Sequence, residues 1–442
     1  MSFQKLSVSA DGRRLIQSDG SPFFYLGDTG WELFHRLNRE DAVLYLQTRA
    51  DAGFTAIQAV ALAEFDGLES PNAYGRRPLK RNSHGEWDPT LPDLDDGYDY
   101  WDHVDFILLR AERLGLYIAL LPTWGDKLNN RVWGKGPRIF DGGNAYAYGL
   151  WMGRRYADRP NIIWVLGGDR PLETRLHFEA VCGMAKGLRE GDGGAHLITF
   201  HPTGGQHSSV PLHDEDWLDF NMIQSGHDRK RFNYEMIAKD YALSPPKPIL
   251  DAEPGYEDHP DAFRPANGFL DAADARQFAY MALLSGGCGH TYGNHSVWGF
   301  VESLPVDGFQ PGHFCATWRK ALYSPGAGQM RHAKDLLLSR DFLSGTPAPG
   351  LVEHQLEGTL HIPVLKGRDY LMAYAAMGQP ITLKADCMDG AAFAASWHDP
   401  RTGGNQPCDT GKSNSGPLTF YPPSGGRGQD WVLVLDVVKG EL

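Results

Sequence analysis

The sequence has few cysteines and no long apolar run, and its first residues predict no secretory leader. Its five cysteines are scattered, odd in number and form no CxxC pair, which argues against a zinc ribbon and a disulfide framework. No stretch approaches the length of a membrane span, and the N-terminal residues MSFQKLSVSADGRRL lack the apolar core of a signal peptide. We therefore expect a cytoplasmic protein that has no membrane partner.

Catalytic motifs of several large enzyme classes are absent as well. Neither GxGxxG nor GxxxxGK follows a predicted strand, which argues against dinucleotide-dependent enzymes and nucleoside triphosphatases. The GxSxG elbow of serine hydrolases is missing, and so is the HExxH motif of zinc peptidases. The first predicted strand carries no His-x-His pair, which metal-dependent hydrolase barrels usually have. We expect neither a cofactor nor a catalytic metal.

Charge and aromatic content narrow the range of partners. Acidic residues outnumber basic ones, 55 against 42, so the formal net charge is -13. This balance repels phosphate backbones and anionic lipids, which argues against a nucleic-acid partner. Aromatic residues make up 12% of the chain, and the flat faces of its 12 Trp and 18 Tyr suit stacking on sugars as well as core packing. The composition is thus compatible with a carbohydrate partner.

The larger part of the chain alternates short apolar runs with amphipathic helical stretches. The runs are Phe23–Leu26, Ala56–Leu62, Tyr117–Leu121, Ile162–Leu166, Leu197–Phe200, Phe220–Gln224, Pro248–Asp251 and Gly289–Tyr292. The helical stretches between them include Glu40–Ala52, Trp101–Leu114, Ala145–Ala157, Glu173–Arg189, Phe232–Tyr241 and Ala272–Leu284. Eight such alternations predict an α/β fold of the (β/α)8 TIM-barrel type rather than a doubly wound sheet. The fifth unit has the weakest helical periodicity, over Pro202–Asp219.

The segments between and after these elements predict how the barrel is completed. Two long polar loops, Leu62–Tyr98 and Trp124–Asn144, leave the carboxyl ends of predicted strands, where barrel enzymes build substrate walls. A helical stretch over His313–Leu338 is predicted to close the barrel. We expect residues 1–343 to form the barrel domain.

Beyond Ser344 the composition changes to that of a small β-domain. The segment SGTPAPG is typical of a linker, and Gly, Pro, Asp and Asn clusters separate short alternating runs after it. These runs are His361–Leu365, Tyr370–Ala375, Ile381–Leu383, Phe393–His398, Leu418–Tyr421 and Trp431–Val437. Residues 344–442 therefore predict an antiparallel β-sandwich domain, with the structural role of packing against the barrel.

The sharpest catalytic candidate is Asp169. It ends the segment Asn161–Asp169, in which a buried apolar strand runs into two glycines and then an acid. Glycines at such a place let the backbone approach a ligand closely, and the carboxyl end of a barrel strand is the catalytic rim. The alternative is a helix cap or an ion pair with neighbouring Arg170.

A second candidate, Glu253, follows the predicted strand Pro248–Asp251. Asp251 and Glu253 are two residues apart, so alternation predicts that both point toward the barrel mouth. Pro254 fixes the backbone directly after Glu253, which favours a placed catalytic group. We expect Asp251 to be a buried structural acid and Glu257 to be a solvated loop residue.

Two carboxylates at the mouth of one barrel supply what cleavage of a glycosidic bond needs. One acid protonates the leaving oxygen, and the other attacks the anomeric carbon or stabilises its positive charge. A separation of about 5 Å between the carboxyl groups would predict retention of configuration, and a wider gap inversion. Asp169 and Glu253 are therefore our predicted catalytic pair.

Further polar and aromatic residues cluster at or near the predicted strand ends. The predicted substrate-binding set contains Asp28, Trp31, Gln58, Trp124, His201, Gln224, His290, Tyr292 and Trp298. Its tryptophans would form aromatic walls, and its polar side chains would bind hydroxyl groups. Each also has a structural interpretation, such as a helix cap for Asp28 or core packing for Trp124. His227 and His295 at the same rim favour a polar pocket.

Four segments together resemble the apiosidase-like glycoside hydrolase family. They are Tyr25–Trp31 (YLGDTGW), Trp164–Arg170 (WVLGGDR), Asp251–Glu257 (DAEPGYE) and His290–His295 (HTYGNH). The tail, with Trp397–Gly403 (WHDPRTG), resembles the small β-domain that usually follows, whose family name suggests collagen binding. The resemblance implies a retaining barrel with Asp169 as acid/base and Glu253 as nucleophile. One characterised branch of the family removes apiose, a branched furanose, from plant pectin.

The resulting prediction is an exo-acting, retaining glycoside hydrolase that needs no cofactor. Its substrate would be a short oligosaccharide or glycoside that carries a furanose of the apiose kind. Two alternatives stay open from the sequence. One is a non-catalytic carbohydrate-binding protein on a barrel scaffold, and the other is a different barrel hydrolase or lyase. The sequence contains no signal for an oligomeric state.

Overall fold

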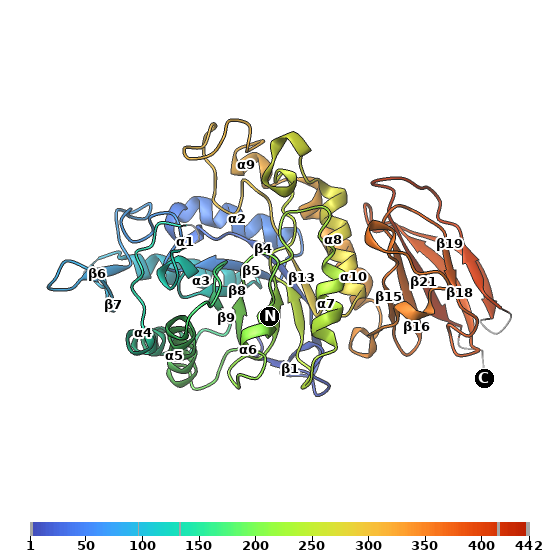
Figure 1. The fold of residues 1–442 in the computed structure, drawn as a ribbon, viewed down its shortest axis with the longest axis horizontal. Coiled ribbons are helices and arrows are strands. Elements are labelled where there is room, and N and C mark those ends of the chain that lie inside the picture. The colour runs from blue at the N-terminus through green and yellow to red at the C-terminus, as the bar shows by residue number, and fades with distance from the viewer. Residues whose placement is uncertain (1–2, 96, 132–133, 413–415, 439–442) are drawn as a thin grey trace.

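The central feature of the structure is a barrel of eight parallel strands (Figure 1). The computed structural model describes residues 3–95, 97–131, 134–412 and 416–438. The barrel strands are β4 (Tyr25–Thr29), β5 (Ala56–Val60), β8 (Tyr117–Leu121), β9 (Ile162–Gly167), β10 (Ile198–His201), β11 (Asn221–Ile223), β12 (Ile249–Asp251) and β13 (Gly289–Tyr292). All their residues are buried, as expected for strands covered on both faces.

The strand order confirms the predicted TIM barrel. Neighbouring strands run in the order β10-β9-β8-β5-β4-β13-β12-β11. The last barrel strand in the sequence, β13, therefore pairs with the first, β4. The remaining seam lies between β10 and β11. It is bridged by the Thr199 hydroxyl, which donates to the Phe220 carbonyl oxygen at 2.6 Å, and by Asp219 N, which donates to the Ile198 carbonyl oxygen at 2.9 Å.

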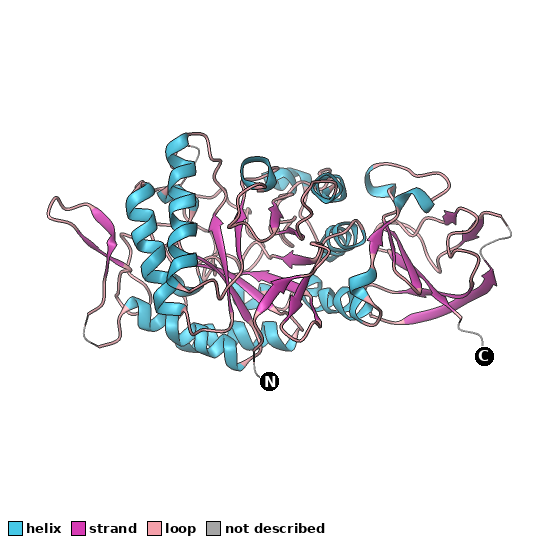
Figure 2. Cartoon of the chain, turned by 90° about the horizontal axis from the view of Figure 1, so that it is seen from below, coloured by secondary structure: helices cyan, strands magenta, loops and turns pink. Residues whose placement is uncertain are grey.

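Helices cover the outer face of the barrel (Figure 2). They are α1 (Leu33–Arg36), α2 (Arg39–Asp51), α3 (Tyr100–Arg113), α4 (Gly142–Tyr156), α5 (Arg175–Gly191), α6 (Ser209–Leu212), α7 (Asn233–Tyr241) and α8 (Ala272–Leu284). Capping boxes begin α3 at Asp99, α4 at Asp141 and α8 at Asp271, because these side chains accept from the first free amides. The fifth unit, with its weak periodicity, holds only the single turn α6.

Two regions differ from the predicted elements. The closing helix predicted over 313–338 is split into α9 (Trp318–Ala321) and α10 (Pro325–Leu338). The reason is Pro325, which has no backbone N–H to continue a helix and therefore stands at the first turn of α10. The chain before the barrel forms a small sheet of β1 (Leu6–Val8), β2 (Leu15–Gln17) and β3 (Pro22–Phe23).

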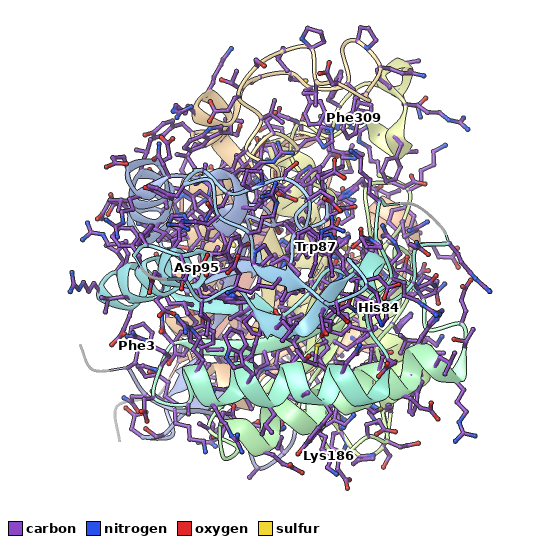
Figure 3. All side chains as sticks on the ribbon, turned by 90° about the vertical axis from the view of Figure 1, so that its left-hand side faces the viewer. Phe3, His84, Trp87, Asp95, Lys186 and Phe309 are labelled. Atoms are coloured by element: carbon purple, nitrogen blue, oxygen red, sulfur yellow. The ribbon has the colours of Figure 1, made fainter. Side chains whose placement is uncertain are left out.

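The long polar loop after β5 contains a hairpin of β6 (Leu79–Arg81) and β7 (Trp87–Pro92). Trp87 is labelled on this hairpin in Figure 3, and Phe309, from the loop before α9, lies near the top of the same view. The indole of Trp87 donates to Glu69 at 2.8 Å, and the guanidinium of Arg81 lies 4.1 Å from its ring centre. The hairpin is thereby tied to its own loop rather than to the cavity described below.

The C-terminal domain is antiparallel, as predicted. Its main sheet has the order β14-β15-β16-β21-β18-β19, and a second sheet pairs β17 with β20. The strands are β14 (Thr346–Pro347), β15 (Val364–Lys366), β16 (Tyr370–Ala375), β17 (Ile381–Leu383), β18 (Ala392–His398), β19 (Asn405–Lys412), β20 (Leu418–Phe420) and β21 (Trp431–Val437). The edge strand β19 was not predicted, because Pro407 and Gly411 interrupt its alternation of apolar and polar residues. It pairs with β18 through a bulge.

The β-domain has a hydrophobic core of its own and also adds residues to the outer core of the barrel. Tyr374 and Val434 from the β-domain belong to the same buried cluster as Tyr280 of α8 and Met330 of α10. The rings of Tyr280 and Tyr374 stack with their centres 5.1 Å apart. The β-domain therefore packs through a hydrophobic interface against α8 and α10, beside which it lies in Figure 1.

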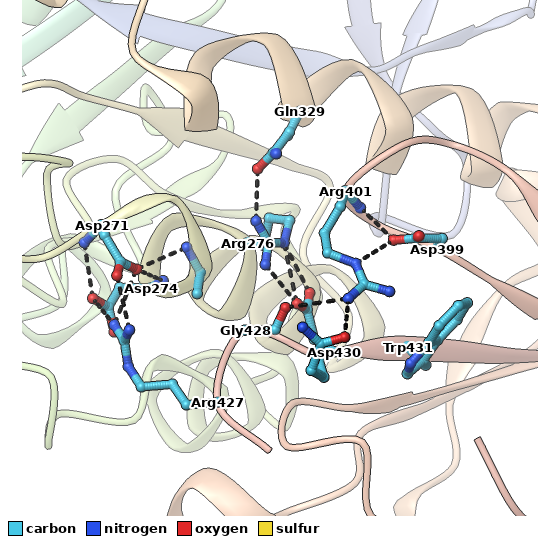
Figure 4. A network of polar contacts seen from close by, with 12 residues as sticks. Asp271, Asp274, Arg276, Gln329, Asp399, Arg401, Arg427, Gly428, Asp430 and Trp431 are labelled. Carbon is cyan, nitrogen blue, oxygen red and sulfur yellow. Dashed lines mark hydrogen bonds and ion pairs between the residues drawn. The ribbon is translucent and has the colours of Figure 1, made fainter. Parts of the chain in front are cut away.

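A buried ion pair crosses this interface (Figure 4). Arg276 of α8 donates to Asp430 at 2.6 Å, and their side chains are only 4% and 2% exposed. Gln329 accepts a further bond from Arg276 at 2.6 Å, and the Tyr374 hydroxyl donates to Asp430 at 3.2 Å. A second pair between the domains, Arg340 with Asp436, is more exposed, at 22% and 43%.

We expect Arg276→Ala to lower the free energy of unfolding by about 3–5 kcal/mol, because it leaves the Asp430 charge buried without a cation. Arg340→Ala is the matched control, and it should cost less than about 1 kcal/mol because water can solvate Asp436. Urea denaturation of both variants measures the difference. Equal losses would show that the buried pair does not dominate the interface.

Candidate active site

A cavity of about 1030 Å³ opens at the carboxyl ends of the barrel strands. Each barrel strand is followed by a residue that lines the cavity. This residue lies within three positions of the strand end, except after β5, where Glu64 lies four positions on. The set is Trp31, Glu64, Trp124, Asp169, Thr203, Gln224, Glu253 and His295. The predicted catalytic pair, Asp169 and Glu253, therefore meets in one cavity. This is the position of the active site in barrel enzymes.

The backbone before Asp169 is left-handed at three consecutive residues. Gly167, Gly168 and Asp169 have φ angles of 86°, 109° and 52°. Glycine is required at the first two, since a Cβ on Gly168 would lie 2.8 Å from the ring of Trp124. Asp is among the few other residues that tolerate this region, and such backbone strain concentrates at functional sites. The turn lifts the Asp169 carboxyl from the end of β9 into the cavity.

The Asp169 carboxyl is mostly buried, with its side chain 14% exposed. Its Oδ1 accepts from the Thr203 hydroxyl at 3.3 Å and from the Gly204 amide at 3.2 Å, while Arg170 lies 3.3 Å from Oδ2. Burial, and next the negative charge of Glu253, raise the pKa of Asp169 to about 6. Asp169 can therefore hold a proton near neutral pH.

Glu253 is held in place through its backbone. Gln58 donates to the Ala252 carbonyl oxygen at 2.9 Å, and Gly226 N donates to that of Glu253 at 2.9 Å. Burial alone would raise the pKa of the Glu253 carboxyl, but its contacts with His201 and His227 outweigh burial and lower the pKa to about 2. Glu253 is therefore ionised throughout the ordinary pH range.

The two histidines present ring nitrogens to the two oxygens of Glu253. His201 Nε2 lies 3.3 Å from Oε2, and His227 Nε2 lies 3.2 Å from Oε1. His227 Nδ1 accepts from the Tyr256 amide at 3.3 Å, which leaves its proton on Nε2, toward Glu253. His201 Nδ1 faces the Pro202 carbonyl oxygen at 3.0 Å.

Aromatic rings and unpaired polar atoms complete the cavity. Trp31 and Trp124 lie with their ring centres 5.0 Å apart, and Trp298 lies 5.5 Å from Phe65. Gln224 Oε1 and Trp124 Nε1 are buried without a hydrogen-bond partner among the described residues. A buried acceptor and a buried donor of this kind are suited to the hydroxyl groups of a bound sugar.

Five predicted substrate-binding residues do not line the cavity. Gln58 and His201 are fully buried and contact the segment of Ala252 and Glu253 instead, and the other three face the helix layer. Asp28 is fully buried against α2, where it accepts from Arg49 at 2.6 Å and from Tyr45 at 2.6 Å. Tyr292, its register partner on β13, donates to Glu257 at 2.6 Å, and His290 lies two residues earlier on the same outward face. Burial lowers the pKa of His290 to about 3, so this ring is neutral.

Of the two acids near Glu253, Asp251 is buried and structural, as predicted, but its direction and the burial of Glu257 differ from the prediction. Asp251 faces away from the barrel mouth, because Ser225 and Asn233 donate to its Oδ2 at 2.7 and 2.9 Å. Glu253 reaches the cavity because the chain leaves β12 after Asp251, so strand alternation was the wrong reason for its placement. Glu257 is not solvated. It is 3% exposed, and burial raises its pKa to about 7.

Some residues that line the cavity were not predicted from the sequence. Glu64 lies 3.7 Å from Arg170, and burial raises its pKa well above the ordinary value. It directly follows the predicted run 56–62, so the argument that selected Asp169 could have found it. Phe263 and Phe309 also line the cavity, from irregular loops that carry no periodic signal. Within the described ranges, no three His, Cys, Asp or Glu side chains are grouped to bind a metal ion.

A (β/α)8 barrel with two unlike carboxylates in one mouth cavity is the arrangement that glycoside hydrolases use. A family model, "Apiosidase-like, catalytic domain", matches residues 9–344, and "Putative collagen-binding domain of a collagenase" matches residues 347–436. The chain belongs to the apiosidase-like family and is a glycoside hydrolase. No curated protein sequence matches the chain.

Solved structures support this assignment over the whole chain. A glycoside hydrolase family 5 protein from Bacteroides vulgatus is 31% identical with a TM-score of 0.88, covering 98% of this chain and 93% of its own. A structure described as a glycoside hydrolase is 30% identical with a TM-score of 0.86, covering 99% and 98%. In the described residues, no helix combines the length and apolar character that a membrane crossing needs.

We expect Asp169→Asn to stabilise the protein at neutral pH. The folded pKa of about 6 lies above the unfolded value, so folding binds a proton between them and stability falls as pH rises through this window. A neutral Asn, which also tolerates the left-handed backbone, avoids the loss, and the gain at pH 7.5 should be about 1–3 kcal/mol.

The gain should vanish near pH 3.5, where Asp169 is protonated in both states. Denaturation across pH measures it, with Asp307→Asn, an exposed acid on the same cavity, as the control. A loss of stability in Asp169→Asn at pH 7.5 would contradict the buried, repelled carboxylate described above.

Proposed function

We propose that the protein is an exo-acting, retaining glycosidase in which Asp169 is the acid/base and Glu253 the nucleophile. The observation that carries the proposal is that both carboxyls line one cavity at the barrel mouth, and the opposite directions of their pKa shifts, to about 6 for Asp169 and about 2 for Glu253, support the two roles. When the pKa values of two carboxyls differ in this way, one group can be a protonated acid while the other is an ionised nucleophile at the same pH.

The proposed reaction has two steps. In the first, Glu253 attacks the anomeric carbon, the bond to the leaving oxygen breaks, and the Asp169 proton moves to that oxygen. In the second, a water molecule attacks the same carbon, Asp169 takes its proton, and the bond to Glu253 breaks. Asp169 thereby regains its proton and Glu253 its charge. The Glu253 charge raises the pKa of Asp169, and this charge is lost when the neutral glycosyl ester forms, so the pKa of Asp169 falls and its role can change from acid to base.

The proposed substrate is a short glycoside or oligosaccharide. The cavity volume of about 1030 Å³ is at the upper end of the range for ligands of drug size, about 300–1000 Å³. A polar groove of about 640 Å³ shares Phe65, Lys135 and Asp307 with the cavity and offers room for a leaving group. The family description supports a furanose of the apiose kind as the released sugar.

We expect the wild-type protein to hydrolyse one or more members of a panel of aryl furanosides and pyranosides that includes a β-apioside. Glu253→Gln should lower kcat on that substrate by at least about 10⁴-fold, since no nucleophile remains. Glu257→Gln is the matched control. This second buried glutamate lies outside the cavity, so its variant should keep turnover once folded.

Equal turnover by Glu253→Gln and wild type would remove Glu253 from the chemistry. On the substrate found, NMR of the first sugar released reports stereochemistry. The proposal requires the anomer of the substrate, whereas the opposite anomer would mean direct displacement by water.

We expect kcat/KM on a poorly activated glycoside to fall as pH rises above about 6, because Asp169 must carry the proton. Asp169→Asn should lower kcat/KM on that substrate by about 10²- to 10⁴-fold. On a dinitrophenyl glycoside, whose leaving group needs no proton, the rate of the first step should change little. Azide, which needs no base, should then accelerate breakdown of the intermediate. Equal losses on both substrates would contradict the acid role.

A further inference from the structure

One wall of the cavity is a short loop in a strained conformation. Ala262 and Phe263 line the cavity between β12 and α8, and both have left-handed φ angles, 51° and 62°. Neither residue type favours that region, so contacts from outside the loop must hold it. The ring of Phe263 lies edge-on to His227 at 5.6 Å, and His227 contacts Glu253. The position of this loop therefore bears on both the sugar site and the nucleophile.

The loop is held by Arg229, which follows β11. The Arg229 amide and Nη1 donate to the two carboxylate oxygens of Asp261, at 2.9 and 3.0 Å, directly before Ala262. Its Nη2 also donates to the Phe269 carbonyl oxygen at 2.9 Å, at the far end of the loop. One guanidinium thus joins both ends of the wall.

Arg229 is in turn held by α8. Its Nε and Nη2 donate to the two oxygens of Asp274 at 2.9 and 3.0 Å. Asp274 is 5% exposed and stands in the first turn of α8, where its Oδ2 also accepts from the Asp271 amide at 2.9 Å. Two-point contacts of this kind fix orientation as well as distance.

The last member of this chain of contacts comes from the C-terminal domain. Arg427, in the loop between β20 and β21, donates through Nη1 to Asp271 at 2.8 Å and through Nη2 to Asp274 at 2.8 Å (Figure 4). Asp274 therefore lies between two guanidinium groups, one from each domain. Without Arg427, the acids Asp261, Asp271 and Asp274 would share the single charge of Arg229.

We propose that Arg427 is a positioning residue for the sugar-binding wall, so that the C-terminal domain contributes to substrate binding as well as to stability. Through Asp274 and Arg229 it holds the loop 258–269, which carries Ala262 and Phe263. Only the expected change in KM rests on the proposed function. Its structural consequence, the order of the loop, is independent of any activity.

The test compares Arg427→Ala and Arg427→Lys with Arg340→Ala, which removes another ion pair between the domains without touching this chain of contacts. Arg427→Ala should raise KM about two- to fivefold with kcat within about twofold, the scale of a half-exposed ion pair that affects binding alone. Arg427→Lys keeps the charge and should recover part of the change, and Arg340→Ala should leave KM as in wild type.

Hydrogen exchange followed by mass spectrometry supplies the second readout. The amides of Asp258, Asp261 and Ala262 donate to backbone oxygens within or beside the loop. Peptides covering 258–269 should exchange faster in Arg427→Ala than in wild type, and Arg340→Ala should not change them. Unchanged exchange in Arg427→Ala would overturn the proposal, and so would an unchanged KM. Absence of turnover on every glycoside would count against the proposed function, while the exchange experiment would still decide the role of Arg427.

Discussion

The structure of the mouth depends on one interaction, the contact of the buried Glu253 carboxylate with His201 and His227. A charge taken out of water is costly unless hydrogen bonds or opposite charges compensate it. The two ring nitrogens, at 3.3 and 3.2 Å, supply that compensation. Trp31 and Trp124 surround His201 at ring distances of 5.3 and 6.1 Å, and limit its access to water. Burial, and next the stabilised charge of Glu253, raise the pKa of Asp169, so this interaction contributes to the state of both acids.

A second constraint is the use of α8 as a shared element. Its first turn carries Asp274, which binds Arg229 of the barrel and Arg427 of the β-domain. Further along, Arg276 forms the buried pair with Asp430, and Tyr280 stacks on Tyr374. The helix that covers the barrel beside Glu253 is therefore also the platform for the second domain. Packing that stabilises the whole chain and contacts that shape the cavity meet on one helix.

The sequence predicted the barrel, and it pointed to the two acids that meet in the cavity, because the signals for both are local. Apolar runs of the right length mark the strands. The segment Gly167–Asp169 contains two glycines, and Trp124 lies too close to Gly168 for a side chain there. Direction was harder to predict. Asp28 and Tyr292 stand at strand ends, but they face the helix layer, where the partners Arg49 and Glu257 come from distant segments. The wall residues Phe263 and Phe309 come from irregular loops, whose placement depends on tertiary contacts alone.

The most direct test of the account is a titration of the two carboxyls by NMR, with ¹³C-labelled Asp and Glu side chains assigned through Asp169→Asn and Glu253→Gln. The account predicts that Asp169 titrates near pH 6 and that Glu253 stays ionised to about pH 2. It also predicts that the pKa of Asp169 falls when Glu253 is neutralised. Ordinary pKa values for both groups, or a reversed order, would contradict the assignment of acid and nucleophile.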